Sequence, residues 1–360
     1  MDSYDTLQQI LDSHPSTAPK TKTFMEILHI LFAPQEAQLA THMSFKGKSV
    51  KDIASASHMD MESVHQILEQ MANKAIIYTA KKDNEVLYGL VPTIPGLFEF
   101  PFMKGMTTET HKKLAQLWET YHHEALGNSF SGNPTPLMRV LPIDTALEPG
   151  IVIHPFEEAR KLIEKAQYIA LTNCACRVSV HKCDKPLDVC MIFDGAAEFL
   201  VDRGYAWKAS VDQTINALMK SEKAGLVHTS NNSKDRATVI CNCCPCCCTV
   251  LRGRTQAGNI NAFSTSRFEA KIDINNCSGC EACVNGRCPM NAITMFNGIA
   301  SVVASQCIGC GLCASVCSSN AITLIERTSA PTIPATVTDM GIKVAQEKGR
   351  LDRFIEVMKK

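Results

Sequence analysis

The sequence predicts an α+β multidomain protein, and three observations support this. The chain has 360 residues, enough for two or three domains of roughly 100–200 residues each. Helical apolar spacing followed by one hairpin pattern occupies residues 23–92. All 18 cysteines lie between Cys174 and Cys317. We therefore expect four segments: a helical domain at 1–104, a cysteine-rich middle domain at 105–268, a cysteine-repeat domain at 269–326, and a linker with a C-terminal helix at 327–360.

The first domain is predicted from "DMESVHQILEQMANKAIIYTAKKDNEVLYGLV". Asp60 can cap a helix whose apolar residues share one face, namely Val64, Ile67, Leu68 and Met71. "AIIYTA" and "VLYGLV" then form a hairpin around a turn at residues 82–84. With the helical patterns upstream, the order of three helices and a two-stranded wing resembles a winged helix-turn-helix.

The charge of this domain argues against DNA as its partner. Residues 21–104 hold eight Lys and Arg against nine Asp and Glu, a net charge of −1. Phosphate contacts supply most non-specific DNA affinity, and the reading helix carries Asp60, Glu62 and Glu69. We expect a scaffold or dimerisation unit, with a homodimer as one assembly, and keep a DNA-binding regulator as an alternative.

The rest of the composition indicates a cytoplasmic protein without a membrane segment. The formal net charge is zero, and "MDSYDTLQQILDSHPSTAPK" lacks the apolar core of a secretory signal. No apolar run approaches the roughly 18 residues that span a bilayer. Disulfides are uncommon in a reducing compartment, so clustered cysteines indicate metal binding.

The strongest pattern is a repeated cysteine spacing at residues 277–317. It reads C-x2-C-x2-C-x4-C-P and then C-x2-C-x2-C-x3-C, and "NAITM" and "NAITL" follow the fourth cysteines at one offset. The pattern resembles bacterial-type ferredoxins with two [4Fe–4S] clusters, in which three close cysteines bind one cube and the fourth binds the other. The resemblance implies cluster I on Cys277, Cys280, Cys283 and Cys317, and cluster II on Cys307, Cys310, Cys313 and Cys288.

Local chemistry supports this spacing. Each C-x2-C-x2-C loop can surround three corners of a cube and direct backbone N–H groups at the sulfurs. Gly279, Gly309 and Gly311 allow the tight backbone that such loops need. The first repeat has one extra residue, which a looser turn at 285–286 can absorb, and Ser318 replaces the usual proline.

Ten further cysteines lie upstream in two groups. "NCACRVSVHKCDKPLDVC" holds Cys174, Cys176, Cys183 and Cys190, and "CNCCPCCC" holds Cys241, Cys243, Cys244, Cys246, Cys247 and Cys248. We expect one or two additional iron–sulfur clusters, some held jointly by both segments, and a non-cubane cluster is included. Structural zinc is the main competing interpretation and buried free thiols the other. Arg177, His181 and Lys182 supply positive charge for an anionic cluster or substrate.

The neighbouring pattern locates "CNCCPCCC" on the fold. Residues 210–242 repeat the helix-and-hairpin order of residues 62–91, so Cys241 and Cys243 are expected at the end of a strand in a second helix-and-wing unit. On an extended chain these two cysteines face one way and Cys244 the other. After Pro245, Cys246 and Cys248 are expected to share a face opposite Cys247.

The chain as a whole is similar to iron–sulfur proteins of anaerobes that place "CxCR" and "CNCC.CCC" stretches before a two-cluster ferredoxin domain. The resemblance implies redox metabolism. We expect the protein to relay single electrons between a redox partner protein and the clusters of its middle domain. One alternative is an iron–sulfur oxidoreductase with a catalytic middle-domain cluster, in which His181 or Arg177 handles protons or substrate charge. Another is a redox-sensing winged-helix regulator. No nucleotide-binding motif is present.

Overall fold

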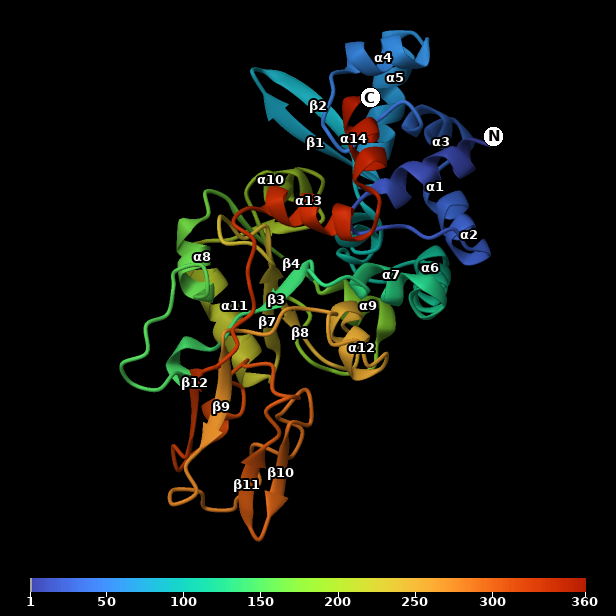
Figure 1. Cartoon of the computed structure of the whole chain (residues 1–360). Coiled ribbons are helices and arrows are strands. Elements are labelled where there is room, and N and C mark those ends of the chain that lie inside the picture. The colour runs from blue at the N-terminus through green and yellow to red at the C-terminus, as the bar shows by residue number, and fades with distance from the viewer. Residues whose placement is uncertain (1) are drawn as a thin grey trace.

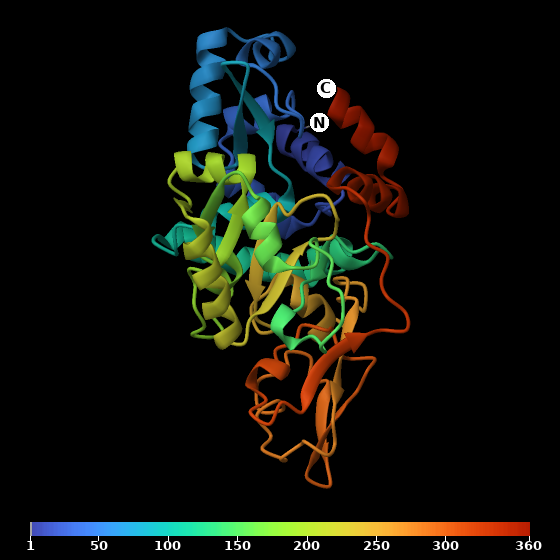
Figure 2. The same cartoon turned by 90° about the vertical axis from the view of Figure 1, so that its left-hand side faces the viewer.

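The computed structural model describes residues 2–360. Figure 1 shows three regions along a long axis: N-terminal helices with the β1–β2 hairpin at one end, a mixed region around a central sheet, and two short antiparallel strand pairs at the other end. The chain's last helices return to the N-terminal region, as the turned view also shows (Figure 2). The mixed α+β class is confirmed.

The N-terminal region begins with five helices and a hairpin. The helices are α1 Ser3–Ser13, α2 Lys22–Leu31, α3 Pro34–Ala40, α4 Val50–Ser57 and α5 Met61–Asn73, and the strands are β1 Ile77–Lys82 and β2 Glu85–Leu90. Asp60 caps α5 by accepting a hydrogen bond from the Ser63 amide at 2.8 Å. Val64, Leu68 and Met71 are buried on the expected face. The helices and hairpin are confirmed, whereas the winged-helix class stays a prediction.

The helical core continues past residue 104. After the short turn η2 Phe100–Phe102 come α6 Glu109–Tyr121, η3 His122–Leu126 and α7 Gly127–Ser131. The Phe24 ring of α2 stacks on Tyr121 with centroids 4.7 Å apart, and meets Trp118 edge-on at 6.2 Å. Helix α6 thus packs with the N-terminal helices, and it reaches from them toward the cysteine-rich region.

A six-stranded sheet forms the centre of the molecule, with the order β3-β7-β8-β5-β4-β6 and antiparallel neighbours throughout. Its strands are β3 Met138–Val140, β4 Ile169–Thr172, β5 Cys190–Phe193, β6 Trp207–Lys208, β7 Val227–Asn231 and β8 Val239–Cys243. Alternating side chains divide between two apolar cores. Helices α8 Ala159–Lys165 and α11 Val211–Lys223 cover one face, and α10 Asp194–Asp202 packs on the other.

The predicted second wing takes a different place in the fold. Strands β7 and β8 do form a hairpin after α11, but β3 and β5 pair with its outer edges. The hairpin is therefore the middle of the sheet and not a free two-stranded wing. Buried hydrogen bonds explain how the polar strand β7 is accommodated, because Asn231 donates to the Arg236 carbonyl and accepts from the Thr238 amide.

The C-terminal segment contains two helices where one was predicted. Helix α13 (Val337–Glu347) is separated from α14 (Leu351–Lys359) by Gly349, whose φ of +63° ends the first helix. The segment docks on the body of the protein: Arg350 pairs with Asp12 and Phe354 lies edge-on to His14, with centroids 5.7 Å apart. Across residues 2–360, no helix is long and apolar enough to span a membrane.

Candidate metal centres

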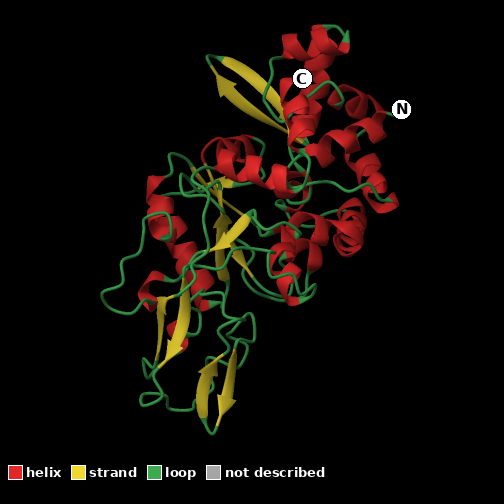
Figure 3. Cartoon of the chain, in the orientation of Figure 1, coloured by secondary structure: helices red, strands yellow, loops and turns green. Residues whose placement is uncertain are grey.

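The cysteine-repeat domain has two nearly equivalent halves. It consists mainly of loops around two antiparallel strand pairs, as Figure 3 shows. One pair is β9 Phe268–Ile272 with β12 Ile322–Glu326, and the other is β10 Ile293–Phe296 with β11 Ile299–Val302. The backbone amides of Ala292 and Ala321 donate to the fourth cysteines, Cys288 and Cys317, each at 3.2 Å. The repeat seen in the sequence is thus a structural repeat as well.

Each half supplies thiols to two separate cavities. Cavity I is lined by four thiols among other residues: Cys277, Cys280, Cys283 and Cys317. Cavity II is lined by another four: Cys288, Cys307, Cys310 and Cys313. These are the two sets that the resemblance to two-cluster ferredoxins implies, with each fourth cysteine crossing to the other half. Their role as ligands stays a prediction.

Glycines allow the loops to approach the neighbouring backbone. Gly279 and Gly309 both have φ of +69°, and a Cβ would lie 2.4 Å from the Gly298 oxygen at the first position and 2.0 Å from the Phe268 oxygen at the second. Any other residue would therefore displace the loop. Gly286, in the turn expected to absorb the extra residue of the first repeat, has a φ of +70°.

The two cavities differ in their surroundings. Cys280 in cavity I is exposed, and the Ala282 amide lowers its thiol pKa. Cys310 in cavity II is buried, which raises its pKa to about 12, and its carbonyl accepts a hydrogen bond from the Ile143 amide at 3.0 Å. Cavity I therefore lies toward solvent at the tip of the domain, and cavity II faces the body of the protein.

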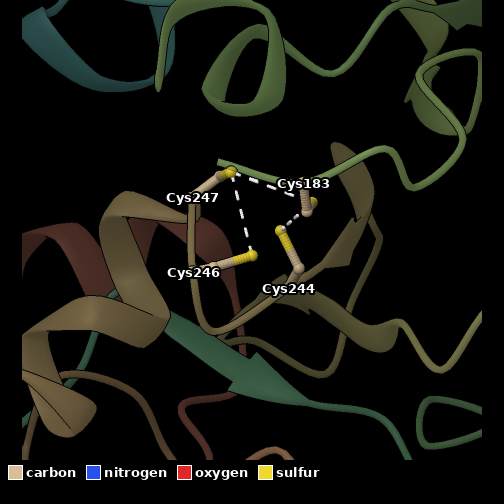
Figure 4. A group of neighbouring side chains, drawn as sticks. All are labelled: Cys183, Cys244, Cys246 and Cys247. Carbon is tan, nitrogen blue, oxygen red and sulfur yellow. Dashed lines mark hydrogen bonds between the residues drawn. The ribbon is translucent and has the colours of Figure 1, made fainter. Parts of the chain in front are cut away.

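A compact four-thiol site joins the two upstream cysteine segments. It consists of Cys183, Cys244, Cys246 and Cys247, whose sulfurs all lie within 4.8 Å of one another. Figure 4 shows Cys183 on one loop facing the other three on the "CNCCPCCC" loop. Three of the sulfur–sulfur distances are 3.7, 3.9 and 3.9 Å. The site could hold a further metal.

These distances fit four thiolates around one ion. A metal–sulfur bond of about 2.3 Å in a tetrahedron gives a sulfur–sulfur edge of about 3.8 Å. A cube is different, because it places each thiolate on a separate iron at the corner of a larger body. The geometry therefore matches a single tetrahedral ion. A hydrogen bond from Cys247 lowers the pKa of Cys244 to about 4, and nearby Arg177 contributes to this shift.

The arrangement after Pro245 differs from the sequence prediction. Cys246 and Cys247 belong to the same site, and Cys248 points elsewhere. The reason is that residues 244–248 form a helical turn, in which the Cys248 amide donates to the Cys244 carbonyl at 3.1 Å. Alternation of faces applies only to extended chain. It holds for Cys241, Cys243 and Cys244, which divide between two sites as expected.

The other six upstream cysteines also lie together, and we call them the six-thiol ring. In order around the ring they are Cys174, Cys176, Cys248, Cys243, Cys241 and Cys190, and each thiol interacts with the next, including the last with the first. Four are buried and two partly buried. Both upstream segments contribute three members, so the joint arrangement expected from the sequence is present.

Several elements of the central fold supply this ring. Cys174 and Cys176 lie at the start of helix α9 (Ala175–Val180), and Cys190 begins β5. Cys241 and Cys243 lie on one face at the end of β8, and Cys248 caps α12 (Thr249–Thr255). The ring is thus formed at the ends of strands and helices of the central fold.

Arg177 lies between the ring and the four-thiol site. Its side chain is buried, donates to the Asn242 carbonyl at 2.8 Å and lies 3.9 Å from Cys244 Sγ. Burial opposes its charge, but the thiols of Cys174, Cys190 and Cys244 raise its pKa. By contrast, His181 and Lys182 are exposed. Of the three cations noted in the sequence, Arg177 is the one placed between the thiol sets.

A small cavity lies beside the ring. It is lined in part by Trp118, His122, Thr249 and Arg252, and the Thr249 hydroxyl lies 3.8 Å from the sulfur of Cys176. Trp118 Nε1, His122 Nδ1 and Arg252 Nε are buried and have no hydrogen-bond partner among residues 2–360. Its volume of about 10 Å³ suits one water-sized molecule. The cavity therefore presents unused polar groups next to a thiol set.

Sequence reasoning missed the partner that holds Arg252. This guanidinium forms two hydrogen bonds to Glu119 of α6, at 2.6 and 2.8 Å. Burial opposes ionisation of Glu119, but Arg252 lowers its pKa to about 2. The position of Arg252, one helical turn after Cys248, could have identified the arginine. Nothing local in the sequence connects it to a glutamate more than a hundred residues away.

Comparison with known proteins identifies one part of the chain. No curated protein and no solved structure matches the chain. Residues 269–318 match a family model described as a 4Fe-4S dicluster domain. This segment contains all eight cysteines that line cavities I and II. The chain therefore carries a 4Fe-4S dicluster domain at its C-terminal side, which implies two [4Fe-4S] clusters.

Proposed function

We propose that the protein transfers single electrons between a partner protein and thiol-bound metal centres in its middle domain. The observation that carries the proposal is the pair of four-thiol cavities in the dicluster domain, one toward solvent and one toward the body. Bound [4Fe-4S] clusters would supply one-electron redox chemistry at both positions. The repeated cysteine spacing and the match to a 4Fe-4S dicluster domain support these cofactors.

The chain's own residues would bind and tune the two clusters. The Cys277, Cys280, Cys283 and Cys317 thiolates would hold cluster I, and the thiolates of Cys307, Cys310, Cys313 and Cys288 would hold cluster II. Backbone N–H groups point at a sulfur in each set, for example Ala300 at Cys277 and Ala270 at Cys307, both at 3.5 Å. Such hydrogen bonds stabilise the thiolates and influence the reduction potential.

A short route leads from cavity II to the middle domain. Helix α12 starts at Cys248 of the six-thiol ring, and near its other end Arg254 donates to the Ser305 carbonyl, two residues before Cys307. Seven residues of helix span about 10 Å. Cys243 and Cys248 share an apolar core with Cys310 and Cys313. We infer that electrons enter at the exposed Cys280 end and continue toward the ring.

The N-terminal region serves as a scaffold in this proposal, in keeping with a winged-helix-like fold. The α5 face that would read DNA is partly occupied, because Arg203 pairs with Glu69 at 2.9 Å and also contacts Asn73. Docked against the middle domain, this acidic helix is poorly suited to phosphates. A titration with duplex DNA at low salt should show no salt-sensitive binding, and tight salt-dependent binding would favour a regulator instead.

An oxidoreductase is the second candidate, because of the small cavity beside Cys176. Three residues that line it have an unpartnered buried nitrogen, and these nitrogens would orient one small polar molecule next to the ring. In this case the ring would be the catalytic centre and the dicluster domain its electron supply. Reduced protein that is reoxidised by a small acceptor without any partner protein would favour this function.

The test of the relay is metal analysis and EPR of anaerobically purified full-length protein. Cys277→Ala and Cys307→Ala occupy equivalent positions of the repeat, so each should remove about four irons and one reduced cubane signal. Thr294→Ala, an exposed position of the same domain that lines neither cavity, should leave both signals unchanged. A wild-type protein whose dicluster domain binds no iron would overturn the proposal. Retention of the metal in the four-thiol site shows that a variant is folded.

A further inference from the structure

We propose that the six-thiol ring is a separate metal centre that binds one iron–sulfur cluster through more than four thiolates, and that the adjacent four-thiol site binds a single zinc ion. The ten upstream cysteines thus divide six and four between two different kinds of site. The ring extends the proposed relay, but its assignment rests on its own geometry.

The width of each thiol set separates the two kinds of site. Among the described residues, the four-thiol site alone brings three or more possible ligands within 4.8 Å of one another. The thiols around cavities I and II are more widely spaced than this, and they belong to a domain family that holds cubes. The thiols of the ring are widely spaced as well, since adjacent thiols interact but no three of them lie within 4.8 Å of one another.

This spacing argues against zinc in the ring. Six thiolates can hold two zinc ions by sharing two bridging ligands, but each ion then needs four sulfurs about 3.8 Å apart. The ring contains no such set of four. Its sulfurs surround a larger body, as the corner ligands of an iron–sulfur cluster do. The compact site and the wide ring therefore favour different metals, although "CNCCPCCC" supplies thiols to both.

The number of thiols argues for a cluster larger than one cube. A single cube takes four terminal thiolates, and two separate cubes take eight. The ring has six, and each interacts with the next in one closed circuit. Eight corner irons need only six thiolates if four are terminal and two bridge a pair of irons each. A cluster of linked or fused cubes therefore uses the whole set.

Unused donors around the ring support an anionic cluster. Arg177 Nε and Nη2 and Arg252 Nε are buried and have no hydrogen-bond partner in the described part of the chain. Buried polar groups are nearly always satisfied, so each indicates an acceptor that belongs at the site. The thiols of Cys174 and Cys190 act on the charge of Arg177, and those of Cys176 and Cys248 on that of Arg252. Sulfides and thiolates of a cluster would accept these hydrogen bonds.

The experiment compares iron, zinc and acid-labile sulfide in the full-length protein and its alanine variants, with ⁵⁷Fe Mössbauer spectra of each. The wild type should contain more than about twelve irons, since the dicluster domain accounts for about eight, together with about one zinc. Each of the six ring cysteines changed to alanine should alter the same Mössbauer component and leave zinc bound. Cys246→Ala is the matched control in the same loop, and it should lose zinc and keep the iron.

Three results would overturn the assignment. Wild-type iron of about eight with about three zinc ions would place zinc in the ring. Iron of about twelve, with two ring variants spectroscopically unchanged, would mean a single cube and two spectator thiols. If Cys246→Ala lost iron and kept zinc, the iron–sulfur cluster would belong to the four-thiol site and zinc to the ring. A protein without dicluster iron but with the ring component intact would refute the relay and leave this assignment standing. Where a variant fails to fold, the iron and zinc contents and the Mössbauer spectrum of the wild type still test the assignment.

Discussion

Arg177 Nη1 lies 3.9 Å from the sulfur of Cys244, and the same guanidinium acts on the thiols of Cys174 and Cys190. One buried cation thus adjoins both upstream thiol sets. It also favours a thiolate in each: the hydrogen bond from Cys174, together with Arg177, holds the pKa of Cys190 well below its usual range, and the pKa of Cys244 is lowered as well. Because metal ligands must be deprotonated, Arg177 favours one ligand thiolate in each thiol set.

Replacing Arg177 should therefore weaken both sites together. Arg177→Met keeps most of the volume but removes the charge and the hydrogen bond to Asn242, so we expect metal to be released to a chelator about 10–100-fold faster, as for loss of an outer-shell partner. Arg177→Lys keeps the charge without the planar fork and should give an intermediate rate. Zinc and iron release are followed separately. Unchanged rates in the methionine variant would contradict the role of Arg177.

The pair of Glu119 and Arg252 should stabilise the packing of α6 against α12. Glu119→Gln leaves the buried guanidinium without its counter-ion, which we expect to cost about 2–3 kcal/mol of unfolding free energy. Glu109→Gln on the same helix breaks an exposed pair with Lys112 and should cost less than about 0.5 kcal/mol. Denaturant midpoints measured anaerobically compare the two, and equal midpoints would refute the prediction.

The pH dependence of this pair has a definite sign. The folded pKa of Glu119 is about 2, below its ordinary value of 4.5. The stabilisation is therefore fully present above pH 4.5 and is lost as the pH falls toward 2. The difference between wild type and Glu119→Gln should shrink over that interval.

Contacts of Arg203 should keep α5 docked on the middle domain. Arg203→Ala removes its bonds to Glu69 and Asn73, and we expect opening of α5 to become easier by about 1–2 kcal/mol, read as faster amide hydrogen exchange in residues 61–73. Lys81→Ala removes an exposed pair with Asp202 and serves as the control, with little change expected. Equal exchange in both variants would show that the docking depends on other contacts.

Docking of α14 should weaken in acid because of His14. Burial, together with Lys348, lowers the pKa of this imidazole to about 3. Below pH 6.5, the ordinary pKa of histidine, the imidazole gains a proton in the unfolded chain but not in the folded one. The folded state is therefore destabilised as the pH falls, by about 1.4 kcal/mol per pH unit at most. Amide exchange of residues 351–359, corrected for its intrinsic pH dependence, should rise between pH 7 and 5. His14→Asn should remove this rise, and an unchanged rise in that variant would assign it to another group.

The sequence predicts local features of this protein well and long-range ones poorly. Fixed spacing identified the dicluster domain, and apolar periodicity with Asp60 located α5 and the following hairpin. Strand alternation separated Cys243 from Cys244 correctly. All of these depend on residues close together in the chain, where spacing and geometry are directly related.

The division of the ten upstream cysteines could not be read from the sequence. It depends on a helical turn at residues 244–248 and on Cys183 leaving its sequence neighbours to join the other loop. The pairing of β3 and β5 with the β7–β8 hairpin is likewise a tertiary event. Local propensity does not fix such contacts, because packing of distant segments decides them.

The central claim is that electrons pass through the dicluster domain to the six-thiol ring. The most direct test mixes oxidised full-length protein with dithionite and freezes samples at set times, so that the Mössbauer component of the ring is followed over time in wild type and in Cys307→Ala. We expect the ring component to be reduced rapidly in wild type and at least about tenfold more slowly once cluster II is removed. A tenfold difference in rate corresponds to about 1.4 kcal/mol in activation free energy. Equal rates of ring reduction in the two proteins would contradict it.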